Sequence, residues 1–195
     1  MDLTPVTLEG EAVRLEPLSL DHLDPLLEAG ADPEIWRYMP SDSTSREGML
    51  AFVNDALTCQ RARTAIPFAT VDRKSGRAIG STRFGNIVPE HKRVEIGWTW
   101  ISPLWQRSAV NTEAKFLMLR YAFETLGCNR VELKTNSLNM RSRNAILRIG
   151  AKEEGTLRSH MINPDGTLRD TVYYSILAPE WPGVRARLEA RLARG

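Results

Sequence analysis

The sequence predicts an α/β (α+β) fold built on one mixed, mostly antiparallel sheet. Three strand-like runs joined by short turns predict an antiparallel meander: Ile66 to Val71, Ala78 to Phe84, and Val94 to Ile101. A regular helical pattern from Asn111 to Leu126 separates the third run from another strand, Arg130 to Thr135. A strand–helix–strand crossover of this kind makes its two strands parallel and the connection right-handed.

The chain opens with a strand and two helices. Residues 13–18 alternate apolar and polar side chains as a strand does, and Ser19 is expected to cap the helix that follows. Thr44 or Ser45 is expected to cap a second helix, whose apolar positions within 49–57 share one face. These elements precede the meander.

The second half of the chain continues the mixed pattern. Residues 139–149 predict a helix that Gly150 ends, and two strands flank the turn at 163–166. A last helix is expected to start near Pro179 or Pro182. The predicted order is βααβββαβαββα, with about seven strands.

Side chains alternate along a strand, so the third run of the meander has two different faces. One face is predicted to be apolar and to carry Val94, Ile96, Trp98 and Trp100. The opposite face is predicted to carry Glu95, Gly97 and Thr99. Glu95 is therefore expected to point away from the apolar stripe.

Length and composition favour a single domain over 1–195. The chain has 195 residues, of which 42% are hydrophobic and 26% are charged, as is typical of a globular protein. No apolar run approaches the roughly 20 residues of a membrane span, and the first residues lack the features of a signal peptide, so a cytoplasmic protein is expected. A net charge of +2 gives no electrostatic argument for nucleic acid.

Two groups of residues are expected to have no special chemistry. Cys59 and Cys128 lie in no metal-ligand spacing, so they are expected to be reduced thiols, and no metal site is predicted. Four arginines near the C-terminus are interleaved with Glu189 and apolar residues and are expected to form a solvated amphipathic tail: Arg185, Arg187, Arg191 and Arg194.

The turn over 105–114 leads from a strand into the most regular helix. A helix N-terminus presents unpaired backbone N–H groups and the positive end of the helix dipole, which favours a bound diphosphate. The alternative is that Asn111 simply caps the helix while Gln106 and Arg107 are solvated. Glu113, in the first turn, is expected to point away from any phosphate.

Several motifs occur together in a fixed order. They are Val94-Glu95-Ile96-Gly97-Trp98-Thr99-Trp100-Ile101, Pro103-Leu104-Trp105, the turn with Thr112-Glu113-Ala114, then Asn139-Met140-Arg141-Ser142 and Ile149-Gly150-Ala151. In this order they resemble the GCN5-related N-acetyltransferases (GNAT), and within them the branch of the Rim-type ribosomal-protein N-terminal acetyltransferases. The resemblance extends over nearly the whole chain.

The resemblance implies a GNAT fold, with helices on both faces of a twisted sheet and two central strands that splay apart around acetyl-CoA. Backbone groups left unpaired by the splay would bond the pantetheine amides. The family's diphosphate loop reads Gln/Arg-x-x-Gly-x-Gly/Ala, whereas this chain carries Gln106-x-x-Ala109-x-Asn111. Arg107 and Ser108 would add a charge and a hydroxyl donor there. The implied cofactor-binding residues are Trp100, Ile101, Ser102, Gln106, Arg107, Ser108, Ala109, Val110, Asn111, Thr112 and Asn139.

Two residues are candidates for catalysis. Glu95 would border the acceptor site by resemblance and act as the general base, directly or through water. The alternative for Glu95 is a surface carboxylate paired with Arg93 or Lys92. Ser142 would lie near the thiol and assist the departing thiolate, or it would merely occupy the first turn of a helix capped by Asn139.

The acceptor is expected to be an amine. Trp36 and Tyr38 lie where relatives build part of the acceptor pocket, although a packing role is an equal alternative. A weak base suits an α-amine better than a lysine, which favours a protein or peptide N-terminus. A small-molecule amine remains open, as does a non-catalytic CoA-binding module. Homodimers are common in this branch.

Overall fold

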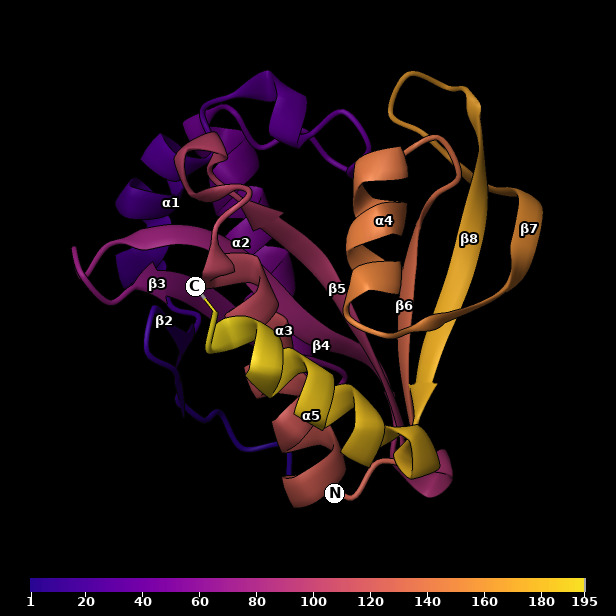
Figure 1. Cartoon of the computed structure of the whole chain (residues 1–195). Helices are drawn as coiled ribbons and strands as arrows, with labels where there is room; N and C mark the ends of the chain where they lie inside the picture. The colour runs from indigo at the N-terminus through magenta and orange to yellow at the C-terminus, as the bar shows by residue number, and fades with distance from the viewer. Residues whose placement is uncertain (195) are drawn as a thin grey trace.

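The computed structural model describes residues 1–194, which form one eight-stranded sheet flanked by helices (Figure 1). The strand order is β1-β2-β3-β4-β5-β6-β8-β7, and every neighbouring pair is antiparallel except β5 and β6. The strands are β1 (Leu8–Glu9), β2 (Val13–Pro17), β3 (Ile66–Asp72), β4 (Ala78–Val88), β5 (Arg93–Ile101), β6 (Arg130–Asn136), β7 (Lys152–Ile162) and β8 (Leu168–Leu177). The strand beyond the seven expected is β1, whose two residues are too few to produce an alternating pattern.

Five α-helices cover the sheet, and they lie on both of its faces. They are α1 (Leu23–Ala29), α2 (Arg46–Arg61), α3 (Ala109–Arg120), α4 (Met140–Arg148) and α5 (Trp181–Leu192). One buried cluster joins α1 and α2 to the sheet, and a second joins α3, α4 and α5 to its opposite face. The predicted α/β fold class is confirmed. Within residues 1–194, no helix is long and apolar enough to cross a lipid bilayer.

Helix α3 begins two residues earlier than predicted. Ser108, not Asn111, is its N-cap, and the Ser108 hydroxyl oxygen accepts a hydrogen bond from the Val110 backbone N–H at 3.3 Å. Asn111 lies inside the first turn of the helix, so the alternative in which Asn111 caps it is wrong. At its other end α3 passes into a π-helical turn over Tyr121–Thr125.

The face alternation predicted for β5 is wrong beyond Gly97. Trp98 adopts a left-handed backbone conformation with φ of 50°, and the register with β4 shifts at the same place. Such a bulge reverses which side chains face each side of the sheet. Val94 and Ile96 therefore pack toward α3, whereas Trp98 and Trp100 pack toward α2 on the opposite face.

The same bulge turns Thr99 toward α3, where it contacts a buried lysine. Lys115 is 7% exposed, and its Nζ lies 2.5 Å from Thr99 Oγ1 and 3.4 Å from Thr82 Oγ1. No carboxylate within residues 1–194 forms an ion pair with Lys115. Burial lowers the pKa of Lys115 from 10.5 to about 7.

This buried lysine makes stability depend on pH. Between pH 7 and 10 the unfolded chain binds the Lys115 proton and the folded chain releases it, so this group raises the free energy of unfolding as the pH rises. In urea titrations, the free energy of wild type minus that of Lys115→Met should increase over this range by up to about 1.4 kcal/mol per pH unit. A difference that stays constant with pH would show that Lys115 is charged in the folded protein.

The parallel pair β5 and β6 is joined only at one end. Its pairs are Arg93 with Arg130, Val94 with Val131, and Glu95 with Glu132. Beyond Glu95 the two strands diverge, although β5 continues to Ile101 and β6 to Asn136. In Figure 1, α4 lies over the space between them. The sheet is thus open at its centre.

Candidate active site

The edge of β5 that borders the gap keeps backbone groups directed toward it. The Ser102 N–H donates to Ile79 O on β4 at 2.8 Å, so Ser102 faces β4. Successive residues of a strand direct their N–H groups to opposite sides, which points the Ile101 N–H and C=O toward the gap. Ile101 O accepts a hydrogen bond from Gln106 Nε2 at 3.0 Å. Of Trp100, Ile101 and Ser102, the three implied cofactor-binding residues at the end of β5, Ile101 is therefore the one whose N–H points into the gap.

Gln106 links the end of β5 to the beginning of α4. Its Oε1 accepts a hydrogen bond from Arg141 Nη1 at 2.8 Å, while its Nε2 donates to Ile101 O. Both ends of the amide are thus occupied by protein groups. Gln106 spans the opening of the gap and helps to hold its two sides in position.

Glu95 lies at the point where β5 and β6 separate, on the face opposite to Val94 and Ile96. It is 3% exposed, and both of its partners contact the same oxygen: Asn86 Nδ2 at 2.8 Å and Lys134 Nζ at 3.1 Å from Oε2. Within residues 1–194, no hydrogen bond is made to Oε1. A Cβ added at Gly97 would lie 2.9 Å from that oxygen, so glycine leaves Oε1 open.

The alternative of a surface carboxylate paired with Arg93 or Lys92 is wrong for Glu95. Arg93 instead pairs with Glu132, at 2.8 Å between Nη1 and Oε2. The partner of Glu95 is Lys134, which compensates the buried negative charge. Lys134 could have been found from the sequence, because the parallel crossover places β6 beside β5.

A second buried cation, Arg169, lies near Glu95 and was also missed. Arg169 is 7% exposed, and its Nη1 donates to Tyr38 O at 3.5 Å. Burial lowers the pKa of its guanidinium, and the charge of Glu95 opposes that shift. Among the described residues, neither Arg169 Nε nor Thr171 Oγ1 has a hydrogen-bond partner. Buried polar atoms without partners are uncommon in folded proteins and mark this face as one able to bind a polar ligand.

Trp36 and Tyr38 have different surroundings. The Trp36 ring is buried against Phe52 and Trp100, and its Nε1 donates to Gly30 O at 2.8 Å. Trp36 is therefore a packing residue that anchors the segment between α1 and α2. Tyr38 is half-buried, and its carbonyl group receives Arg169.

The first turn of α4 borders the gap from the other face of the sheet. Asn139 is its N-cap, and Asn139 Oδ1 accepts a hydrogen bond from the Ser142 N–H at 3.0 Å. The Ser142 side chain is half-buried in that turn. His160 is exposed on β7, and its ring lies 5.8 Å from the Tyr173 ring. The Nζ of Lys134, which pairs with Glu95, lies 5.7 Å from the centre of the same Tyr173 ring.

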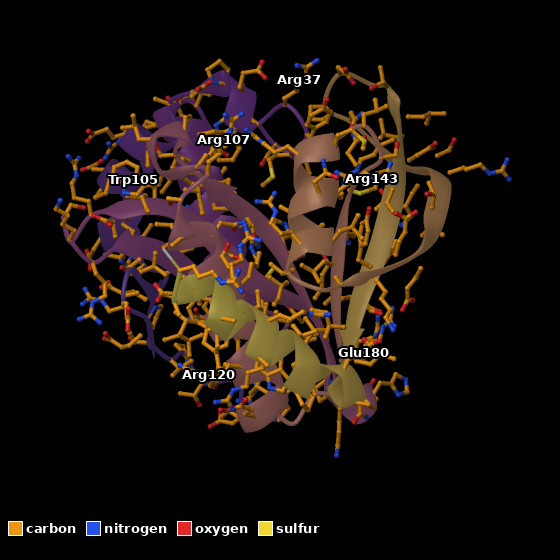
Figure 2. The ribbon with its side chains drawn as sticks, in the orientation of Figure 1. Arg37, Trp105, Arg107, Arg120, Arg143 and Glu180 are labelled. Atoms are coloured by element: carbon orange, nitrogen blue, oxygen red, sulfur yellow. The ribbon has the colours of Figure 1, made fainter. Side chains whose placement is uncertain are left out.

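The turn before α3 opens into a cavity of about 630 Å³. Arg107 in this turn has a left-handed backbone with φ of 63°, and the Ser108 hydroxyl donates to Trp105 O at 2.6 Å. Arg107, Ser108, Ala109 and Thr112 line one side of the cavity, and the ends of α4 and α5 line the other. Figure 2 shows Arg107 on the same face of the molecule as α4 and α5.

The C-terminal arginines are only partly the solvated tail that the sequence predicts. Arg185 is exposed and paired with Glu124 and Glu189. Arg187, Arg191 and Arg194 instead line the cavity beside the cofactor turn. These three arginines follow one another at spacings of four and three residues, and residues at such spacings lie on one side of a helix. This spacing was the signal in the sequence that could have located them.

These features fit acetyl-CoA. The gap between β5 and β6 presents a free backbone edge for an extended amide chain, and the turn before α3 presents helix N–H groups and a cationic cavity to phosphates. A buried carboxylate with one open oxygen lies at the point where the strands separate. Together they are the features expected of an acyltransferase whose donor binds between two strands of the sheet.

Comparison with known proteins gives the family. The family model described as "Acetyltransferase (GNAT) domain" matches residues 12–152 of this chain. The chain therefore belongs to this family. It is therefore an N-acetyltransferase that uses acetyl-CoA.

Individual relatives agree with this assignment. An uncharacterized N-acetyltransferase, p20, from Bacillus licheniformis is 29% identical over 182 residues, which cover 91% of this chain and 99% of that protein. The crystal structure of a GCN5-related N-acetyltransferase from Brucella melitensis has a TM-score of 0.90 and 32% identity, and covers 96% of this chain and 86% of that one. The ribosomal protein uS5-alanine N-acetyltransferase of Escherichia coli is 28% identical over 122 residues, or 62% of each chain.

Proposed function

We propose that the enzyme acetylates the α-amine of a protein or peptide N-terminus. The observation that carries the proposal is the Glu95 carboxylate, which is buried beside the gap with Oε1 open and Oε2 held by Asn86 and Lys134. The likeness to an enzyme named as the alanine N-acetyltransferase of ribosomal protein uS5 supports a protein as the acceptor.

Each proposed role follows from the position of the residue. Acetyl-CoA, when bound, supplies an activated acetyl thioester. Glu95 Oε1 accepts the proton that the attacking amine gives up, directly or through a water molecule. The Ile101 N–H, directed into the gap, is a hydrogen-bond donor for the cofactor. The Ser142 hydroxyl, on the first turn of α4, donates a hydrogen bond to the departing thiolate.

The remaining site residues position these groups. Gln106 bridges β5 and α4, and Asn139 caps α4 so that Ser142 keeps its place. Ser108 to Thr112 provide the helix N-terminus that receives the diphosphate. Tyr38 and Arg169 form part of the acceptor side, and Trp36 holds the segment that carries Tyr38.

The titration of amines favours an α-amine over a lysine side chain. Deprotonating a lysine of pKa about 10.4 at pH 7.4 costs about 4 kcal/mol, whereas an α-amine of pKa about 8 costs under about 1 kcal/mol. A single carboxylate whose charge is already compensated by a lysine is better suited to deprotonating an α-amine than a lysine side chain. The enzyme would therefore select its acceptor by the pKa of the amine as well as by contacts in the pocket.

The acceptor class can be tested with matched peptides. With acetyl-CoA present, thiol release should be at least about tenfold faster with a peptide that has a free N-terminus than with one that is N-terminally blocked and carries an internal lysine. The rate should rise with pH and level off near the α-amine pKa of about 8. Equal rates with both peptides, or release with small amines alone, would reject the α-amine acceptor.

A further inference from the structure

The cavity beside the cofactor turn carries more positive charge than a diphosphate site requires. Three separate elements supply guanidinium groups to it: the turn, the end of α4, and the last turns of α5. The arginines that line it are Arg107, Arg148, Arg187, Arg191 and Arg194, and no acidic residue is among its lining residues. Like charges gathered in this way repel one another unless an anion lies between them.

These arginines also lack the ion pairs that occupy other arginines of the protein. Within residues 1–194, no salt bridge is made by Arg148, Arg187 or Arg191. Arg185, on the same helix as two of them, is paired with both Glu124 and Glu189. The difference lies in where the side chains point, because Arg185 does not line the cavity.

The junction after α4 provides room for one of these guanidinium groups. Gly150 has φ of 97°, and a Cβ added there would lie 2.8 Å from Arg187 Nη2. A residue with a side chain would be strained at this φ and would displace the guanidinium. Gly150 thus allows α5 to bring Arg187 against the end of α4.

We propose that Arg187 and Arg191 of α5, with Arg148 and Arg194, form a subsite for the 3′-phosphate of acetyl-CoA. The donor carries a diphosphate and, on its ribose, a separate dianionic phosphate, and guanidinium groups bind phosphate oxygens in pairs. One wall of the cavity is the diphosphate turn itself, so a third phosphate of the same ligand lies within reach of the other walls. Binding of a free acidic peptide or a nucleic acid would not explain why the cavity shares a wall with the diphosphate turn.

The part of this subsite that α5 supplies lies outside the segment that the family model matches. The family model ends at residue 152, whereas α5 begins at Trp181. The inference depends on the use of acetyl-CoA and not on the identity of the amine. It assigns to α5 a role in donor selection: the helix would distinguish CoA from the analogue that lacks the 3′-phosphate.

The test compares two ligands that differ only in that phosphate. Isothermal titration of the wild-type protein should give a dissociation constant for CoA about tenfold or more below that for dephospho-CoA, since one charge-assisted contact changes affinity by about that factor. The double variant Arg187→Gln/Arg191→Gln should bind CoA about tenfold or more weakly while its affinity for dephospho-CoA stays unchanged. Arg185→Gln removes the same charge from the same helix and should alter neither affinity.

Other outcomes overturn the subsite. Equal wild-type affinity for the two ligands would reject it, as would a double variant that weakens both ligands equally, which indicates a general electrostatic effect. Absence of CoA binding to wild type would reject it together with the cofactor assignment. Because no acceptor is present in these titrations, a failure of the α-amine proposal would leave the expected result unchanged.

Discussion

Replacing Glu95 with glutamine should lower the turnover number by about a hundredfold or more while leaving the affinity for CoA unchanged. A general base contributes about 10² to 10⁴ to the rate, and glutamine keeps the size of the side chain but cannot accept the proton. Turnover is measured by thiol release at saturating peptide, and CoA affinity by titration calorimetry. Glu95 lies on the opposite face of the sheet from α3, so loss of its charge should leave the phosphate cavity intact.

Glu132→Gln is a matched control for this experiment. Glu132 is the residue of β6 that pairs with Glu95, and it is compensated by Arg93 and Arg130 instead of Lys134. It lies where the two strands are still joined, so its loss should change turnover by less than about threefold. A similar loss of turnover in both variants would indicate that charge on this face acts through stability and not through proton transfer. Normal turnover of the Glu95→Gln enzyme would show that Glu95 is not the base.

The larger features of this fold could be predicted because they depend on local patterns. Strand alternation, helical spacing and capping residues gave the order of elements, and the structure confirms the mixed sheet and its parallel crossover. The ordered motifs pointed to acetyl-CoA, and the family match confirms that. Errors arose where two residues carried the same local signal. Ser108 and Asn111 are both good N-caps, and the position of the preceding turn over Pro103–Trp105 decides between them.

The bulge in β5 could not be predicted by such rules. Tryptophan rarely adopts positive φ, so nothing at Trp98 signals a break in alternation. Its conformation is held by contacts distant in sequence: the Arg83 guanidinium lies 4.7 Å from the centre of the Trp98 ring, and Lys115 binds Thr99. The contact between Glu95 and Asn86 has the same origin, because Asn86 lies on the neighbouring strand β4. Local patterns located the carboxylate, whereas only the tertiary structure shows which of its oxygens is open.

Removing the side chain of Glu113 should lower the free energy of unfolding by about 3 to 5 kcal/mol, with a drop in Tm of about 10 °C. Glu113 is 7% exposed on α3, and its carboxylate accepts three backbone N–H groups, from Glu11 and Ala12 at 2.7 Å and from Val13 at 2.8 Å. Glu113→Ala would leave these donors without partners. The measurement is urea denaturation at neutral pH.

Two further variants separate hydrogen bonding from charge. Glu113→Gln keeps one acceptor oxygen and should lose roughly half as much stability as Glu113→Ala. Glu189→Ala removes an exposed glutamate from a surface pair on α5 and should cost less than about 1 kcal/mol. A loss below about 1 kcal/mol for Glu113→Ala would mean that water satisfies the three donors. The expected large loss would instead show that α3, the helix proposed to receive the diphosphate, is fixed to the sheet by one buried carboxylate. The geometry of the turn before α3 would then depend on the first strands of the chain.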